Sequence, residues 1–223
     1  MKRLISLIMA VLMLASLCAC AKNTTTTTPT NTEPNTEEAT MSPSYYVNNL
    51  VFGEHYDTSY SNESLKIGFS LPPEWSITNT TKLAEMNEMD EEEMIANFHQ
   101  VMKDHETATM LYAESDDGAS SIEIIAQNLE ATGHKTITAD EYMEIFEEPY
   151  RESLEEEGAT DIIVAPSTVY ISNIKHTVRL VSYTMDDKKV YQEQVLFPFT
   201  DYMVLVIMTG DTETILNRIY SLY

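Results

Sequence analysis

The sequence predicts an α+β fold in which an antiparallel β-sheet carries helices on both faces. Apolar side chains alternate along residues 65–71, as in a strand with one buried face. The Asp117-Gly118 pair lies between two β-rich segments and is typical of a hairpin turn, which joins antiparallel strands. Thr138 and Glu141 have the spacing of a capping box, which indicates that a helix begins there. Strands joined by hairpins, with helices inserted among them, are typical of this fold class.

The first part of the domain is expected to form one strand and one long helix. The strand at 65–71 ends at Pro72-Pro73, and the single tryptophan, Trp75, follows it. We interpret Trp75 as a core residue under the sheet edge rather than as a ligand platform. Residues 80–103 show helical periodicity, and Asp90 with Glu93 has capping-box spacing. The expected inward residues of this helix are Met94, Ile95, Phe98, Val101 and Met102.

The middle of the domain is expected to form a hairpin and a second helix. The hairpin strands lie at 107–114 and 120–129. The helix begins at Thr138 and ends at Gly158, because glycine readily takes the left-handed conformation that closes helices. Pro149 should kink or shorten this helix, because proline lacks the backbone N–H. Its expected inward residues are Tyr142, Ile145, Phe146 and Leu154.

The last part of the chain is rich in β-branched residues and is expected to be mainly strand. Residues 202–208 are apolar throughout, so both faces of that strand should be covered. Asp211 is expected to cap a final helix with Ile215, Leu216 and Ile219 inward. The expected strands are 161–167, 168–171, 175–185, 189–197 and 202–208, with turns at Pro166, Asn173, Asp186-Asp187 and Asp201.

Residues 1–19 have the layout of a secretory signal peptide. Lys2 and Arg3 precede an uncharged apolar run at 4–17, and small residues follow it. The run is shorter than the ~20 apolar residues that a membrane-spanning helix needs. The sequence therefore predicts export rather than a permanent transmembrane helix at this end.

The chain's two cysteines, Cys18 and Cys20, directly follow this run. Leu17-Cys18-Ala19-Cys20 resembles a bacterial lipobox, in which the last cysteine is lipidated and the signal is cut before it. The resemblance implies a diacylglycerol on Cys20, a stable anchor because it inserts two acyl chains into the membrane. A disulfide between the two cysteines is disfavoured, because a one-residue gap does not give the usual Cα separation. A chance Cys-X-Cys after an ordinary signal peptide is the alternative.

The rest of the chain divides into a tether and one domain. Residues 20–44 are rich in Thr, Pro, Asn and Glu without apolar periodicity, which predicts a disordered tether behind the lipidated Cys20. Residues 45–223 have the length of a single α+β domain. The expected location is therefore the extracytoplasmic face of the cell membrane, with the domain held there by the lipid anchor.

The charge of the chain restricts its partners. It carries 36 acidic and 13 basic residues, a net charge of −23, which becomes −25 when Lys2 and Arg3 leave with the signal. Such a domain repels nucleic acid and anionic lipid headgroups, so no nucleic-acid partner is expected. The charge would attract a cationic envelope protein or peptide. Solubility beside a negatively charged cell surface is the explanation we favour for the charge, and such a partner is the alternative.

No motif in the sequence points to catalysis, a metal or a cofactor. The five histidines lack the His-Glu-X-X-His spacing, and no Gly-X-Ser-X-Gly elbow occurs. Acidic clusters at 89–94, 114–118, 155–158 and 185–189 lack the alternating ligands of a calcium loop. We interpret these clusters as solvated surface and expect no catalytic residue, metal or cofactor.

One stretch carries a family resemblance. The segment "YSNESLKIGFSLPPEWSITNTTKLAEMN" at 60–87 resembles the opening of small, uncharacterised clostridial (Firmicutes) lipoproteins. The later Asp-Gly hairpin, the acidic helix and the C-terminal strands are similar as well. The resemblance implies a PsbP-like fold, an antiparallel sheet between helical layers, and an envelope location. It supplies no catalytic residues.

These observations favour a non-enzymatic envelope lipoprotein that binds or supports another component. The alternative is an envelope hydrolase whose site is assembled from distant residues. A transporter's solute-binding protein is disfavoured, because such proteins usually have two lobes and a longer chain.

Overall fold

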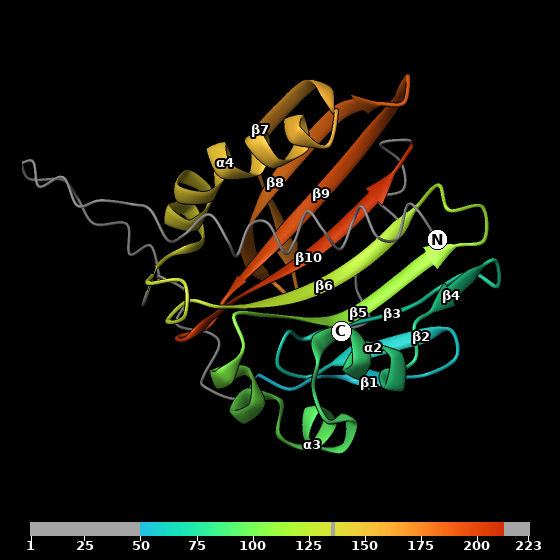
Figure 1. The fold of residues 1–223 in the computed structure, drawn as a ribbon, viewed down its shortest axis with the longest axis vertical. Coiled ribbons are helices and arrows are strands. Elements are labelled where there is room, and N and C mark those ends of the chain that lie inside the picture. Colours follow the sequence, from blue (N-terminus) through green and yellow to red (C-terminus); the bar gives the residue numbers. More distant parts are fainter. Residues whose placement is uncertain (1–49, 135–136, 212–223) are drawn as a thin grey trace, which may run out of the picture.

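The computed structural model describes residues 50–134 and 137–211, which form an α+β fold with two antiparallel sheets (Figure 1). A seven-stranded sheet has the order β4-β5-β6-β10-β9-β8-β7, and a three-stranded sheet has the order β1-β2-β3. The predicted fold class is confirmed. The predicted signal peptide, Cys20, the tether and the residues expected to face inward from a final helix lie outside the described residues.

The elements of the first half are short. They are β1 (Glu54–His55), β2 (Ser59–Asn62), β3 (Ile67–Ser70), β4 (Trp75–Ile77), α2 (Thr80–Asn87), α3 (Glu91–Val101), a 3-10 turn (Met102–Asp104), β5 (Thr107–Ser115) and β6 (Ser121–Asn128). The second half has one helix and four long strands. These are α4 (Ala139–Glu156), β7 (Thr160–Ile171), β8 (Ile174–Met185), β9 (Lys188–Pro198) and β10 (Tyr202–Gly210).

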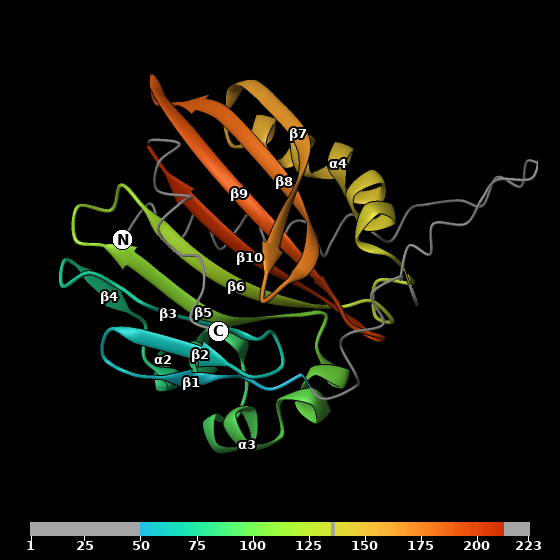
Figure 2. The same cartoon turned by 180° about the vertical axis from the view of Figure 1, so that it is seen from behind.

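Helical layers cover both faces of the large sheet, as predicted (Figures 1 and 2). One face packs against α2, α3 and the three-stranded sheet, and the other packs against α4. The central strand β10 shows how the faces divide, because its side chains alternate. Val204, Val206 and Met208 join the first core, whereas Met203 and Leu205 join the core under α4. The prediction that this strand is covered on both faces is confirmed.

Tight turns connect the long strands. Ser172 and Asn173 between β7 and β8 both have positive φ (49° and 63°), as do Asp186 and Asp187 between β8 and β9 (50° and 59°). Two successive positive φ values match the type I′ turn, whose twist suits a hairpin. Gly118 (φ 65°) lies in the predicted β5–β6 hairpin turn, which is confirmed.

The predicted turn at Pro166 is wrong. Residues 161–167 and 168–171 were expected to be separate strands, but both belong to β7. Strand β7 lies at the edge of the sheet, where a residue without a backbone N–H is tolerated. The half-buried Trp75 lies in β4, the opposite edge strand, and packs against the core, as predicted.

The helices differ from the sequence prediction in three ways. Residues 80–103 form two helices, because Glu88 takes a left-handed conformation (φ 57°) and closes α2. Ile95 and Ile145, both expected inward, are 49% and 39% exposed. Helix α4 is not shortened at Pro149 and continues to Glu156, so that it ends just before Gly158, as predicted. Its C-terminal half packs on the sheet, so tertiary contacts outweigh the local cost of the proline.

Candidate functional site

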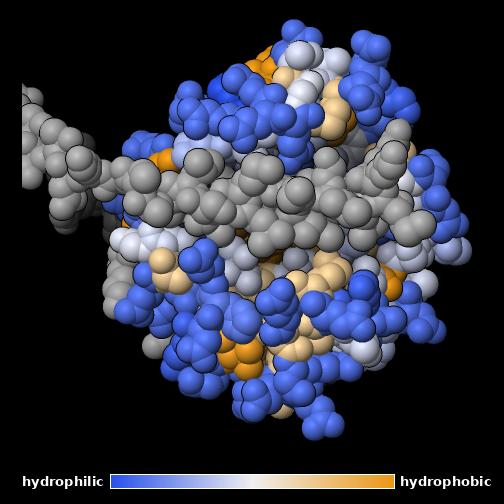
Figure 3. All heavy atoms as spheres, viewed as in Figure 1, coloured by the Kyte–Doolittle hydropathy of each residue, from blue (hydrophilic) through white to orange (hydrophobic). Residues whose placement is uncertain are grey.

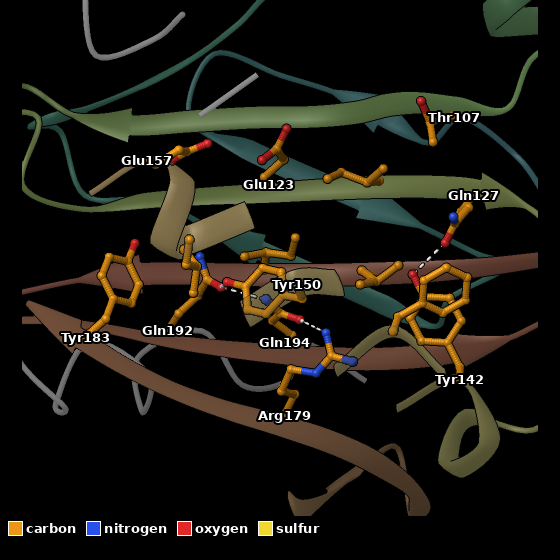
Figure 4. A pocket seen from close by; sticks show the side chains of 15 residues that line it. Thr107, Glu123, Gln127, Tyr142, Tyr150, Glu157, Arg179, Tyr183, Gln192 and Gln194 are labelled. Atoms are coloured by element: carbon orange, nitrogen blue, oxygen red, sulfur yellow. Dashed lines mark hydrogen bonds between the residues drawn. The ribbon is translucent and has the colours of Figure 1, made fainter. Parts of the chain in front are cut away.

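A cavity lies between α4 and the face of the large sheet that it covers (Figure 4). The space open to the centres of water molecules is about 80 Å³. One water needs roughly 10–15 Å³ by this measure, so the cavity has room for several waters or a small organic molecule. Its walls come from β5, β6, β8, β9, β10 and the region of α4. The lining residues are Thr107, Glu123, Ile125, Gln127, Tyr142, Phe146, Tyr150, Leu154, Glu157, Arg179, Tyr183, Gln192, Gln194, Leu205 and Ile207.

Two sequence periods bring these side chains together. On the helix, Tyr142, Phe146, Tyr150 and Leu154 recur every four residues, which places them on one stripe facing the sheet. On the strands, alternate residues point to the same face, so the floor is built from every second position. The floor pairs are Glu123 with Ile125, Gln192 with Gln194, and Leu205 with Ile207.

Strand register aligns four floor residues in one row across the sheet. Glu123 on β6 pairs with Ile207 on β10, Ile207 pairs with Gln194 on β9, and Gln194 pairs with Arg179 on β8. Neighbouring strands lie about 4.8 Å apart, so the backbones of Glu123 and Arg179 are separated by roughly 14 Å. The row therefore has an acidic residue at one end and a basic residue at the other.

Arg179 is a buried cation without a carboxylate partner among the described residues. Its side chain is 2% exposed, and the ion pair found in this part of the chain is Lys82–Glu85. Nη1 donates to Gln194 Oε1 (3.2 Å) and Nη2 donates to the Met143 carbonyl (3.4 Å). The guanidinium lies 5.3 Å from the ring centroid of Tyr150. Burial lowers the pKa of Arg179, but arginine stays protonated in proteins.

Amide side chains hold this cation in place. Tyr150 Oη donates to Gln192 Oε1 (2.5 Å), and Gln194 Nε2 donates to the same oxygen (2.6 Å). Gln192 Nε2 in turn donates to Thr209 Oγ1 (3.0 Å). Because the amide nitrogen of Gln194 donates to Gln192, the amide oxygen of Gln194 faces the Arg179 guanidinium. The network fixes the orientation of the cation with neutral groups only.

The opposite end of the row carries a carboxyl group that is mostly neutral at pH 7. Glu123 is 4% exposed, and burial raises its pKa to about 8, against a smaller opposing effect of the Thr109 hydroxyl. Burial also raises the pKa of Glu157, which follows α4. Glu157 Oε1 has no hydrogen-bond partner among the described residues. The row therefore has a cation at its Arg179 end and a mostly neutral carboxyl at its Glu123 end.

The residues that the sequence singled out do not form this site. Cys20 lies outside the described residues, so its lipidation stays a prediction. The described part of the chain contains no group of three or more His, Cys, Asp or Glu suited to a metal ion. Sequence reasoning missed the cavity, although two signals were present. One is the pair of glutamines at inward positions of β9, and the other is the four-residue stripe of α4.

The comparisons with known proteins do not assign this chain to a family. No family model matches the chain, and no curated protein matches it. A crystal structure of LpqN, described as involved in cell envelope biogenesis of Mycobacterium tuberculosis, is similar over part of its length. The two share 10% identity with a TM-score of 0.32, and the match covers 52% of this chain and 76% of LpqN. A likeness at this level says nothing about function, and the expected clostridial family gains no support from a family model.

The described helices were also compared with the requirements of a membrane span. Within residues 50–134 and 137–211, no helix is both long and apolar enough to cross a membrane.

Proposed function

We propose that this protein is an extracytoplasmic lipoprotein, anchored to the cell membrane through Cys20, whose domain is a non-enzymatic binding module. The cavity under α4 is its binding site for a small ligand. The observation that carries the proposal is Arg179, whose charge is buried in a cavity wall and forms no ion pair within 4 Å among the described residues, although Glu147 interacts with it at longer range. The lipid anchor is supported by the lipobox resemblance of Leu17-Cys18-Ala19-Cys20.

An unpaired buried charge is expensive, and this cost is the reason to expect a ligand. A buried cation loses its hydration and is stable only when other groups replace it. Here the replacements are neutral: the oxygens of Gln194 and Met143 and the ring of Tyr150. A hydrophobic side chain at position 179 would avoid the cost entirely. A ligand that compensates the charge gives the arginine a function.

The lining residues also favour binding over catalysis. Among the described residues, no Ser, Cys or His lines the cavity, so the usual nucleophile and base pair is not found there. The specific observation in favour of a hydrolase is Glu123, because a carboxyl group with a pKa of about 8 suits a general acid. A glycosidase needs a second, ionised carboxylate. Burial raises the pKa of the other lining carboxyl, Glu157, and so disfavours its ionised form, and for this reason we favour binding.

A cationic partner remains part of the proposal, and the outer side of α4 is where it would bind. Figure 3 shows mainly hydrophilic residues over the part of the surface where α4 lies. The one basic residue of α4, Arg151, is half-buried and donates to the Ile162 carbonyl. The exposed acidic residues of α4 are Asp140, Glu141, Glu144, Glu148, Glu152, Glu155 and Glu156.

The anchor is tested by labelling cells with a palmitate analogue. Cys20→Ser is expected to abolish labelling and release the protein from the membrane fraction, because the acylated sulfur is lost. Cys18→Ser is the matched control and should leave both the palmitate labelling and the membrane association unchanged. Labelling that persists in Cys20→Ser contradicts the lipoprotein assignment.

The binding site is tested by blocking the cavity. The full chain, purified in detergent, is incubated with a small-molecule extract, washed and analysed by native mass spectrometry. Leu205→Phe adds volume under α4 and is expected to remove the bound species. Ile145→Phe is the control, because Ile145 lies on the same helix but is exposed. Equal ligand recovery from both variants would place the site elsewhere. Turnover of an extract component that Glu123→Gln abolishes would favour the hydrolase instead.

A further inference from the structure

We infer that the ligand of this cavity is a small monocarboxylic acid with an apolar body, whose carboxylate pairs with Arg179. This inference rests on the proposed function, since it names the ligand class of the same cavity. Three parts of the cavity support the inference: the charge of Arg179 at one end of the floor row, the apolar residues in its middle, and the neutral carboxyl of Glu123 at the other end.

The positive charge of Arg179 selects an anionic ligand, and the planar shape of its guanidinium group favours a carboxylate. Two hydrogen bonds of the guanidinium are found in the described residues, to Gln194 Oε1 and to the Met143 carbonyl, and Nε has no partner there. Donors therefore remain for an incoming acceptor. The planar guanidinium matches the planar carboxylate and can hold it through two parallel hydrogen bonds. An ionised acceptor would also compensate the buried charge.

The middle of the cavity selects an apolar body. Ile207 stands between Glu123 and Gln194 in the floor row, and Leu205 lies two residues along the same strand. The α4 wall adds further apolar surface over them. Burying an apolar body against such walls stabilises the bound ligand. The apolar residues of the lining are Ile125, Phe146, Leu154, Leu205 and Ile207.

The far end of the row argues against a second carboxylate on the ligand. Among the lining residues described, Arg179 is the one cationic side chain. A second carboxylate near Glu123 and Glu157 would lose its hydration without gaining a cation. An acid with one carboxylate places its charge at Arg179 and its apolar end toward Glu123. The cavity's limited volume restricts this ligand to a small molecule.

The test compares three probes of similar length: hexanoate, hexanamide and adipate. Each is titrated calorimetrically into the full chain in detergent at pH 6.5 and moderate salt. Hexanoate is expected to bind at least about tenfold more tightly than hexanamide, which lacks the charge, and than adipate, which carries a second one. This comparison uses the unaltered protein, so it does not depend on whether a variant folds.

Variants then assign the effect to one side chain. Arg179→Gln is expected to remove the preference for hexanoate over hexanamide, and Arg179→Lys is expected to retain part of it, because the charge stays but the planar donor pair is lost. Arg151→Gln is the matched control on α4 and should bind hexanoate like the unaltered chain. Arg151 contacts the Ile162 carbonyl and does not line the cavity.

The outcomes separate the ligand class from the proposed function. Equal binding of hexanoate and hexanamide, tighter binding of adipate, or no hexanoate binding overturns the monocarboxylate inference. If Leu205→Phe still removes an extracted ligand in that case, the cavity remains the binding site and only the ligand class is wrong. If Leu205→Phe changes nothing either, both proposals fail.

Discussion

One face of the seven-stranded sheet packs against α2, α3 and a second sheet, whereas the other face packs against α4. The first face builds one continuous apolar core that includes Phe52, Met110 and Phe197. The second face has two smaller apolar clusters, one around Phe146 and one around Tyr150 and Leu154. Buried polar side chains and the cavity lie along this face.

The same strands supply both faces, so the difference comes from which residues occupy alternate positions. On β9, Val195 and Phe197 point to the first core, whereas Gln192 and Gln194 point toward α4. An apolar residue at either glutamine position would pack without a hydrogen-bonding requirement. The comparison indicates that the first face supplies most of the apolar packing, whereas the α4 face carries the polar groups of the proposed binding site.

The largest expected effect tests the packing difference directly. Phe197→Ala should reduce the free energy of unfolding by about 3–5 kcal/mol, because it leaves a cavity in a close-packed core. Phe146→Ala should cost less, because Phe146 already lines a cavity and loses fewer contacts. Chemical denaturation of both variants measures the difference. A larger loss for Phe146→Ala would contradict the assignment of the main stabilising core to the first face.

The second prediction concerns pH on the α4 face. The pKa of Glu123 is raised to about 8 from its ordinary value of 4.5, so the folded state holds a proton that the unfolded chain releases. The resulting stability is complete below pH 4.5 and is lost as the pH rises to about 8, by about 5 kcal/mol. Glu123→Gln should flatten this part of the stability curve. The polar groups near the Glu123 carboxyl include Tyr112, which is its pair on β5, together with Thr109 and Glu157. None of these three side chains is a cation.

The control for this prediction is Glu114→Gln. Glu114 lies at the more exposed end of β5 and accepts a hydrogen bond from Tyr112. This variant should keep the slope between pH 4.5 and 8. An unchanged slope in Glu123→Gln would show that the carboxyl is ionised in the folded protein.

The third prediction concerns pH on the opposite face. His55 stacks on Phe52, with ring centroids 5.0 Å apart, and burial lowers its pKa to about 4 from 6.5. The folded state disfavours the charged imidazole, so stability is complete above pH 6.5 and is lost as the pH falls to about 4. The expected loss is about 3 kcal/mol. His55→Phe should remove this acid-side loss in a denaturation series, whereas His105→Gln should not.

The smallest predicted effect compares helix ends from the two layers. Asn79 caps α2 by accepting from the Lys82 N–H, and Thr138 caps α4 in a full capping box with Glu141. Asn79→Ala and Thr138→Ala should each cost about 1 kcal/mol. Similar losses would show that the two faces differ in packing rather than in helix-end stability. A loss several times larger at Thr138 would mean that α4 depends mainly on its cap.

Local patterns predicted much of the fold because they act over a few residues. The Asp117-Gly118 turn, the Thr138–Glu141 capping box and the covered strand 202–208 are all confirmed. The errors occur where a tertiary neighbour decides the outcome. Pro166 is tolerated because β7 is an edge strand, and Ile145 is exposed because the sheet lies on the other side of α4.

The candidate site could not be predicted in the same way. Glu123, Ile207, Gln194 and Arg179 come from four strands that are distant in sequence, and only the sheet register aligns them. No sequence period connects positions across separate strands. The burial of the three polar residues in this row likewise depends on α4, which lies between β6 and β7 in the sequence.

The sequence by itself determined most of the long strands, the β5–β6 hairpin turn, the capping box of α4 and the α+β class, because backbone geometry and side-chain periodicity are local. It also carries the lipobox resemblance that makes Cys20 the predicted anchor. Only the tertiary structure decided that Arg179 is buried without a carboxylate partner in the described residues, and that it shares a cavity with Glu123. The physical reason is that burial and pairing depend on strand register and on the layer above the sheet, neither of which a single segment contains.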